Sequence, residues 1–399
     1  MSKEIRKAPE TGDGSSGWSA AGPEMYNRRR FLGGAMLAGL AAVAGGAAAE
    51  SSAGAAPGER SAPGAAAGGK PLAAGAPVPH DGSRLGPTEG GADPPGGPRL
   101  AKVAMGPPFG GLRGQQRAVL FRSLFEYPEQ WVQTRSLVGQ LLVADWLTQK
   151  KFLADSELRR WFAQMHQWGM SLSLEVGAIK PSGQTSQATL HAERPLWDRV
   201  LRLGAPLSTL AMDEPLCCCR FAIHKPDRYA VRETADFIAA VRQHYPTILI
   251  GDIEPYPSLS LRDHFSWIEA LEKRLAELQV RGLDFYRLDV DWMVFLIRQQ
   301  GSWQEVRKLE DYCHQRHLPF SLIYWAANYP WLQRMNLADN STWYVEMMSQ
   351  GYNYAAIGGR PDQLVIESWV GAPSRCVPET ADWTFTRSVR DFARKFTRS

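Results

Sequence analysis

Short runs of apolar residues recur along the chain from residue 102 onward, and each is followed by a longer stretch with apolar residues at helical spacing. The first kind of segment predicts a β-strand and the second an amphipathic α-helix. Because the short runs are apolar on both faces and alternate with helices, we expect one parallel sheet. The runs are residues 102–106, 140–146, 171–177, 208–214, 247–254, 284–292, 320–325 and 363–369.

Local signals at the ends of the intervening segments support helices between the strands. The stretch 155–168 opens on Asp155 and Ser156, the stretch 226–245 begins with a proline, and Ser302 to Glu305 has the pattern of a capping box. Eight strand–helix units in about 300 residues fit a closed (β/α)₈ barrel, a fold of roughly 250 residues. An open, doubly wound sheet is the alternative, but it usually carries G-x-G-x-x-G after its first strand, where this chain has MGPPFGG.

The N-terminal part of the chain has a different composition. Residues 1–49 contain Asn-Arg-Arg-Arg-Phe-Leu at 27–32, then an Ala/Gly/Leu stretch that ends in three alanines, which predicts a twin-arginine export signal. That stretch is too weakly hydrophobic to predict a membrane-spanning helix. Residues 50–99 are mostly Ala, Gly, Pro and Ser and predict a disordered linker. We therefore expect a barrel at 100–399, exported to the periplasm, the cell wall or the medium.

Charge and cysteine usage narrow the possible partners. The net charge is +4 and no long basic run occurs beyond the N-terminus, which argues against a nucleic-acid partner. Five cysteines, three of them consecutive at 217–219, include no C-x-x-C pair, which argues against a structural zinc site. We expect free thiols, with a bridge from this triplet to Cys376 as the alternative, and a monomer that has no membrane partner in its mature form.

Acidic residues follow most of the predicted strands. In a barrel, the C-terminal strand ends and the loops after them form the active site. Because the acids come from several strands, we expect them to converge on one mouth. They are Asp145, Glu175, Asp213, Glu214, Asp252, Glu254, Asp289, Asp291 and Glu367.

Aromatic residues accompany these acids at or just beyond the strand ends. Their rings can stack on the C–H faces of a sugar, while the acids bind hydroxyl groups or transfer protons. The combination predicts a carbohydrate substrate. The aromatic residues are Trp146, Tyr256, Trp292, Tyr324, Trp325 and Trp369.

Asp213-Glu214-Pro215 at the end of the fourth strand resembles the Asn-Glu-Pro motif of the superfamily of retaining (β/α)₈ glycoside hydrolases. The resemblance implies that Glu214 is the acid/base residue. That superfamily has its nucleophile, a glutamate, at the end of strand seven, where this chain reads LIYWAANYP without a carboxylate. The nucleophile therefore has no counterpart here.

Glycoside hydrolysis needs two carboxylates, and the sequence offers several. We expect Glu214 to be the general acid, since the charge of Asp213 would raise its pKa. Glu254 is the first candidate for the partner, because it lies on the next strand and is also followed by proline, and Asp291 is the second. We expect Asp213, Asp289, Glu175, Glu367 and the six aromatic residues to bind the substrate, and no metal or organic cofactor to take part.

Two other functions fit the same residues. Glu214, Glu254, Glu367 and one of the strand-six aspartates could hold Mg²⁺ or Mn²⁺ in a metal-dependent isomerase or hydrolase. A glycan-binding barrel without catalysis would need the same aromatic residues. The sugar, the linkage and the stereochemistry do not follow from the sequence.

Overall fold

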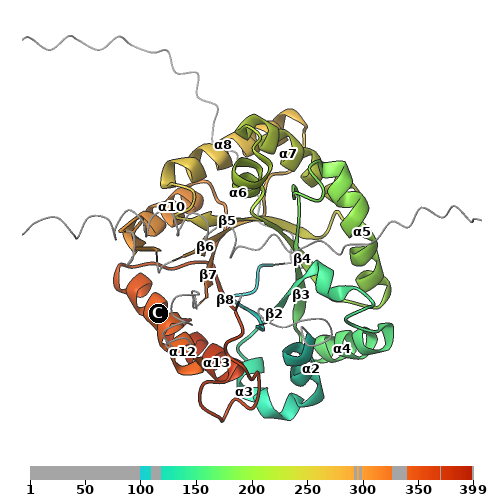
Figure 1. Ribbon diagram of the computed structural model, residues 1–399, viewed down its shortest axis with the longest axis vertical. Helices are drawn as coiled ribbons and strands as arrows, with labels where there is room; N and C mark the ends of the chain where they lie inside the picture. Colours follow the sequence, from blue (N-terminus) through green and yellow to red (C-terminus); the bar gives the residue numbers. More distant parts are fainter. Residues whose placement is uncertain are drawn as a thin grey trace, which may run out of the picture. The chain divides into compact units, whose positions relative to one another are not determined.

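The structure is a computed structural model that describes residues 99–108, 118–291, 294–295, 299–325, 339–368 and 370–397. Eight parallel strands follow one another around a closed barrel, and β8 pairs with β1 (Figure 1). The predicted (β/α)₈ barrel is confirmed, and the open sheet is excluded. The strands are β1 (Val103–Gly106), β2 (Gln140–Ala144), β3 (Ser171–Val176), β4 (Leu207–Asp213), β5 (Leu249–Tyr256), β6 (Phe285–Val290), β7 (Phe320–Tyr324) and β8 (Gln363–Glu367).

The helices form a ring around this barrel (Figure 1). Each helix can cover the barrel because its apolar residues lie on one side. In α4, the buried residues Leu158, Trp161, Phe162 and Met165 form one such apolar stripe. The helices include α2 (Val119–Glu126), α3 (Val132–Arg135), α4 (Asp155–Gln167), α5 (Ser186–Arg202), α6 (Pro215–Cys218), α7 (Asp227–His244), α8 (Leu261–Glu277), α10 (Trp303–Gln315), α12 (Asn340–Ala356) and α13 (Phe385–Phe396).

All three predicted helix starts can be compared with the structure, and Pro226 directly precedes α7, which begins at Asp227. Ser302 caps α10 and accepts a hydrogen bond from the Glu305 amide, but the Ser302 amide donates to the Tyr256 hydroxyl, so only half of the predicted capping box forms. Helix α4 instead begins after Ala154, whose amide donates to Glu157 at 3.0 Å, so neither Asp155 nor Ser156 is its cap. Glu157 in the first turn thus satisfies the amide of the N-cap residue, while no side chain caps the amides of the first turn.

A group of hydrogen-bonded polar side chains lies in the N-terminal half of the barrel interior. Gln140 of β2 donates to Thr209 of β4 at 2.9 Å, Arg287 of β6 donates to Gln363 of β8 at 2.8 Å, and Gln363 donates to Gln140 at 3.1 Å. None of these strand pairs are neighbours, so the bonds pass through the interior. We call Gln140, Thr209, Arg287, Ser321 and Gln363 the polar floor.

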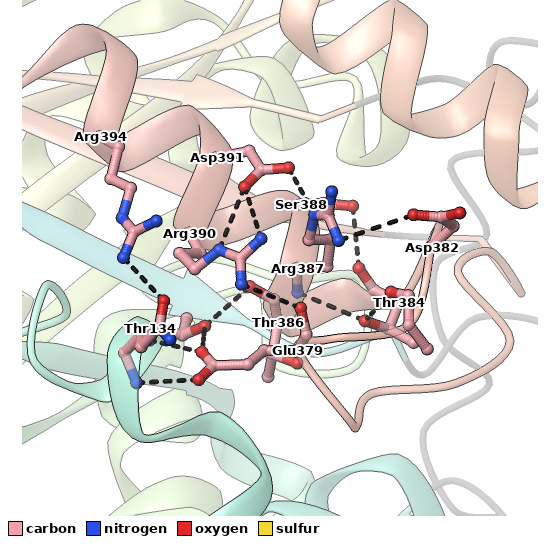
Figure 2. A network of polar contacts seen from close by, with 12 residues as sticks. Thr134, Glu379, Asp382, Thr384, Thr386, Arg387, Ser388, Arg390, Asp391 and Arg394 are labelled. Carbon is pink, nitrogen blue, oxygen red and sulfur yellow. Dashed lines mark hydrogen bonds and ion pairs between the residues drawn. The ribbon is translucent and has the colours of Figure 1, made fainter.

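The segment after β8 joins the last helix to the first helices of the ring. Glu379 accepts hydrogen bonds from the amides of Gln133 and Thr134 and from the Thr134 hydroxyl, at 3.0, 2.7 and 2.6 Å. The Thr134 hydroxyl also donates to the Thr386 carbonyl, and Arg390 of α13 donates to the Glu379 carbonyl (Figure 2). Helix α3 is thereby tied to α13, which closes the ring of helices.

Some predictions lie outside the described residues. These are the export signal, nearly all of the linker, and the side chains of Trp292 and Trp369. Among the described helices, none is both long enough and apolar enough to cross a membrane.

Candidate active site

The alternation of side chains along each strand divides the strand-end acids into two groups. Side chains two residues apart on a strand point to the same face. Asp213, Asp289 and Glu367 are each an even number of residues from a polar-floor residue on the same strand, so they also point into the barrel. Leu172 and Leu174 pack in the core shared with the helices, which turns Glu175 inward. The acids that point into the barrel, which we call the inner acids, are Glu175, Asp213, Asp289, Asp291 and Glu367.

Strand β6 carries a column of three charged residues on its inner face. Arg287 lies in the polar floor, Asp289 comes two residues later, and Asp291 follows the strand end. All three are nearly buried, with exposed fractions of 1%, 3% and 6%. Burial lowers the pKa of Arg287 to about 10, while the nearby carboxylates of Glu367 and Glu175 oppose this shift. The guanidinium therefore lies beneath carboxylates from two other strands, β3 and β8.

Close packing brings Glu367 against the first strand. A Cβ placed on Gly106 of β1 would lie 3.2 Å from the Glu367 Cβ and 3.4 Å from its Oε2. It would also lie 3.4 Å from the Cβ of Leu142 on β2. The absence of a side chain at Gly106 leaves room for the Glu367 carboxylate at the mouth.

Asp213 at the end of β4 is paired with a lysine from the loop after β3. The ammonium of Lys180, in the loop after β3, lies 2.5 Å from Asp213 Oδ2 and 2.6 Å from the Asp213 carbonyl. Desolvation lowers the pKa of Lys180, but Asp213 and other nearby acids outweigh it and raise the pKa overall. Repulsion of Glu214 by the charge of Asp213 is therefore offset by this cation.

Glu214 adopts a backbone conformation that is rare for a residue with a side chain. Its φ is 55° and its ψ is 49°, the left-handed region, which costs roughly 1–2 kcal/mol for a non-glycine residue. Its amide donates to the Ile253 carbonyl at 2.9 Å, and its carbonyl accepts from the Cys218 amide at 2.8 Å. The side chain is 8% exposed and is close enough to Lys180 and Glu254 to influence their ionisation. Backbone strain at a buried carboxylate is typical of functional sites.

Glu254 and Asp252 point the other way, toward the helices. The two carboxylate oxygens of Glu254 accept from the amides of Leu216 and Cys217 at 2.6 and 3.1 Å, at the start of α6. Asp252 accepts from the Trp267 indole of α8 at 2.6 Å. Both side chains are fully buried, and desolvation raises the pKa of Asp252 to about 8 and that of Glu254 well above its usual value.

Asp145 also lies among the helices. It follows β2 in a short 3₁₀ turn and accepts from the Trp197 indole of α5 at 3.3 Å. Of the nine acids that end strands, the structure thus directs five into the barrel. It places Glu214 beside them and Asp145, Asp252 and Glu254 behind them.

The predicted aromatic residues also divide between those that face the barrel interior and those that face the helices. Trp325, two residues beyond Ile323 of β7, continues the inner face and is 7% exposed. Tyr324 points outward and packs against Phe392 of α13, with ring centroids 4.6 Å apart. The Tyr256 hydroxyl accepts from the Ser302 amide at 3.0 Å beside α10, and Trp146 packs edge-on against Phe152. Of the four predicted aromatic residues that the structure describes, Trp325 is therefore the one that faces the mouth.

Two cations of this site, Arg287 and Lys180, are not among the residues predicted from the sequence. Arg287 is two residues before Asp289 and four before Asp291, so the period of two in the strand could have placed it beneath them. Lys180 lies in a loop, where no periodicity indicates the direction of a side chain.

Two further features bear on the chemistry. All five cysteines are buried thiols outside any disulfide, and burial raises the pKa of the Cys218 thiol to about 12 and that of Cys219 to about 11. Within the described ranges, no group of three or more His, Cys, Asp or Glu side chains is arranged to hold a metal ion.

Comparisons with known proteins give similarity in structure but not in sequence. No protein-family model and no curated protein sequence matches this chain. Similar solved structures include a glucosidase from Croceicoccus marinus (TM-score 0.43, 12% identity, 67% of this chain and 63% of that one). Another is a variant of xylanase A from P. fluorescens subsp. cellulosa in complex with xylopentaose (0.41, 11%, 72% and 97%). A third is D-psicose 3-epimerase in the presence of D-fructose (0.38, 11%, 74% and 97%).

Proposed function

We propose that this protein is a glycoside hydrolase whose substrate lies over the inner acids at the C-terminal end of the barrel. The observation that carries the proposal is the convergence of five carboxylates from β3, β4, β6 and β8 on the barrel interior, with Arg287 beneath them and Lys180 beside them. A dense array of acceptors suits a ligand rich in hydroxyl groups. Trp325 on the same face offers a ring for stacking.

The proton donor is one of the two aspartates at the end of β6. Asp289 and Asp291 share the inner face, and two like charges on neighbouring positions of one face favour retention of a proton by one of them. A protonated carboxyl is what the leaving oxygen of a glycoside requires. We assign Asp291, which lies closer to solvent along the strand, the donation of that proton.

Glu214 is the second catalytic carboxylate. The ammonium of Lys180 attracts it, and the strained backbone fixes its position at the end of β4. In this proposal it attacks the anomeric carbon or activates a water, rather than donating the proton as the sequence suggests. Glu254 is left out of the catalytic pair because it is fully buried and its oxygens bind the amides of α6.

The remaining inner acids orient the sugar. Glu175, Asp213 and Glu367 come from three different strands and can accept hydrogen bonds from separate hydroxyl groups. We also propose that the chain is exported by the twin-arginine route, as the sequence around Arg28 and Arg29 predicts.

The test is hydrolysis of a panel of polysaccharides and aryl glycosides by the full chain in EDTA. Glu214→Gln and Asp291→Asn should each lower kcat by about 100-fold or more. Asp311→Asn, on the outer helix α10 where the side chain is 48% exposed, removes a carboxylate far from the mouth and should leave kcat unchanged.

Other outcomes would redirect the assignment. Activity that needs Mg²⁺ or Mn²⁺ would support the metal-dependent enzyme. Oligosaccharide binding without turnover, unaffected by Glu214→Gln, would support a glycan-binding barrel. Hydrolysis that survives both substitutions would overturn the roles given to Glu214 and Asp291.

A further inference from the structure

Helix α12 places three polar side chains in line on its buried face, next to the end of β7. Trp343, Glu346 and Gln350 follow one another at spacings of three and four residues, so they are neighbours on one side of the helix. The side-chain amide of Gln350 donates to the Trp325 carbonyl at 2.6 Å. This face of α12 therefore contacts the residue that directly follows β7 and whose ring faces the mouth.

Glu346 lies beyond the end of β7, on the side of the mouth. In a (β/α)₈ barrel the strands run toward the mouth and each following helix runs back from it. Gln350 is level with Trp325, and Glu346 comes four residues earlier in α12, about 6 Å closer to the mouth. Because β7 ends at Tyr324, Glu346 is above the last residue of the strand rather than behind it.

Four buried polar atoms of these residues have no hydrogen-bond partner in the part of the chain that the structure describes. Two are donors, the indole N–H groups of Trp325 and Trp343, and two are oxygens, Gln350 Oε1 and Glu346 Oε2. Native proteins leave few such atoms, because each costs free energy that a partner would recover. A hydroxyl group both donates and accepts, so hydroxyl groups of a ligand can satisfy atoms of both kinds.

A buried glutamate on the neighbouring helix α10 shows how such a group is normally paired in this protein. Glu310 is fully buried, and its carboxylate accepts from the Arg360 amide and from the Tyr354 hydroxyl. Among the described residues Glu346 Oε2 has no comparable donor, although the side chain is only 8% exposed. Desolvation raises the pKa of Glu346 to about 8, so at neutral pH the group is largely a neutral acid that can donate as well as accept.

We propose that Glu346 and Gln350, together with the indole N–H of Trp325, form a subsite that binds hydroxyl groups of the substrate at the mouth beside β7. This assignment rests on the proposed function, because it adds a contact for the sugar that lies over the inner acids. In the subsite Gln350 Oε1 accepts from one hydroxyl group, the Trp325 indole donates to a hydroxyl oxygen, and Glu346 can do either. These are binding contacts, and the proton donor and the second catalytic carboxylate stay as assigned above.

Thermal unfolding tests the unpaired state of Glu346 without any substrate. Glu346→Met is similar in shape and removes a buried carboxyl group that has no partner for Oε2, so Tm should rise by roughly 2–4 °C. The rise should grow between pH 5 and pH 8. The folded wild type keeps a proton that the unfolded chain releases near pH 4, so the wild type loses stability as pH rises toward about 8.

Glu310→Met is the matched control for this measurement. It should lower Tm at every pH, because it leaves the Arg360 amide and the Tyr354 hydroxyl without their acceptor. If Glu346→Met lowered Tm as Glu310→Met does, Glu346 would be part of the framework of the fold, and the subsite would be overturned.

Kinetics on the glycoside that the wild type hydrolyses best test the contact itself. Glu346→Met should raise KM by about 10-fold with a smaller change in kcat, since the lost hydrogen bonds hold the substrate before and during the reaction. Glu346→Gln still donates and accepts, so it should keep most of the wild-type affinity. Trp325→Phe keeps a ring but removes the N–H, and it should also raise KM.

The remaining outcomes separate the subsite from the proposed function. An unchanged KM in both Glu346→Met and Trp325→Phe would mean that water alone binds these groups, and would overturn the subsite. If the protein is not a glycosidase, no variant will hydrolyse glycosides, yet the pH-dependent gain in Tm of Glu346→Met will remain.

Discussion

Gly251 lies on the inner face of β5, where any larger side chain would overlap the ring of Phe285. Phe285 begins β6 and is fully buried inside the barrel, so the two strands can approach only because one of them carries no side chain at this point. Glycine weakens a strand in general, and here close contact with the ring requires it.

Gly251→Ala should lower the free energy of unfolding by about 1–3 kcal/mol, the usual cost of overpacking a core. Gly282→Ala is the matched control, because a Cβ there meets no atom within 4 Å. Urea unfolding monitored by circular dichroism would measure both. Equal stability of the two variants would mean that Phe285 moves aside without cost.

At this scale the sequence predicts less about the site than about the fold. Strand-ending acids can be found from their spacing, but Glu254 and Asp213 look alike in sequence and face opposite sides of the barrel. The difference depends on the register and direction of each strand, which a run of apolar residues on both faces does not specify. The residue that offsets the charge of Asp213, Lys180, comes from a loop whose path only the tertiary structure determines.

The positions of the secondary-structure elements were predicted better than the contacts of single residues. All eight strands fall where the apolar runs predict them, because a buried strand requires such a run. The predicted N-cap of α4 was wrong, because the helix begins after Ala154, which has no side chain able to cap it, and Glu157 in the first turn binds the Ala154 amide instead. The contact of the last segment with α3 could not be predicted, because residues 134 and 379 are brought together only when the barrel closes.

That contact gives a prediction about the ends of the barrel domain. Glu379→Gln replaces one acceptor oxygen with an amide that faces the donors of α3, so it should cost about 1–3 kcal/mol of unfolding free energy. Asp382→Asn is the control, because Asp382 is 72% exposed and lies 3.6 Å from Arg387, and it should change stability by about 0.5 kcal/mol or less.

Hydrogen exchange on the same two variants would locate the effect. Amides of α3 and α13 should exchange faster in Glu379→Gln, while strands on the far side of the barrel stay protected. Uniformly faster exchange would mean that the contact stabilises the whole barrel rather than joining its ends.

For the whole molecule, the prediction concerns export. Arg28→Lys together with Arg29→Lys should keep the precursor in the cytoplasm of a host that has the twin-arginine route. Arg30→Lys, one residue further along, should leave export intact. Fractionation followed by immunoblotting distinguishes the two, and export of the double variant would exclude this signal.

The polar floor has a consequence for how eight similar strands find one arrangement. Apolar side chains of about equal size would tolerate a strand displaced by two residues, since the same face would still point inward. Gln140, Arg287 and Gln363 do not tolerate such a displacement. Their hydrogen bonds join strands that are not neighbours, and they can form in only one register of the strands around the barrel. A displaced strand would leave the Arg287 charge buried without these partners, a cost of several kcal/mol. These side chains therefore select the shear of the barrel, and with it the strand ends that meet at the mouth.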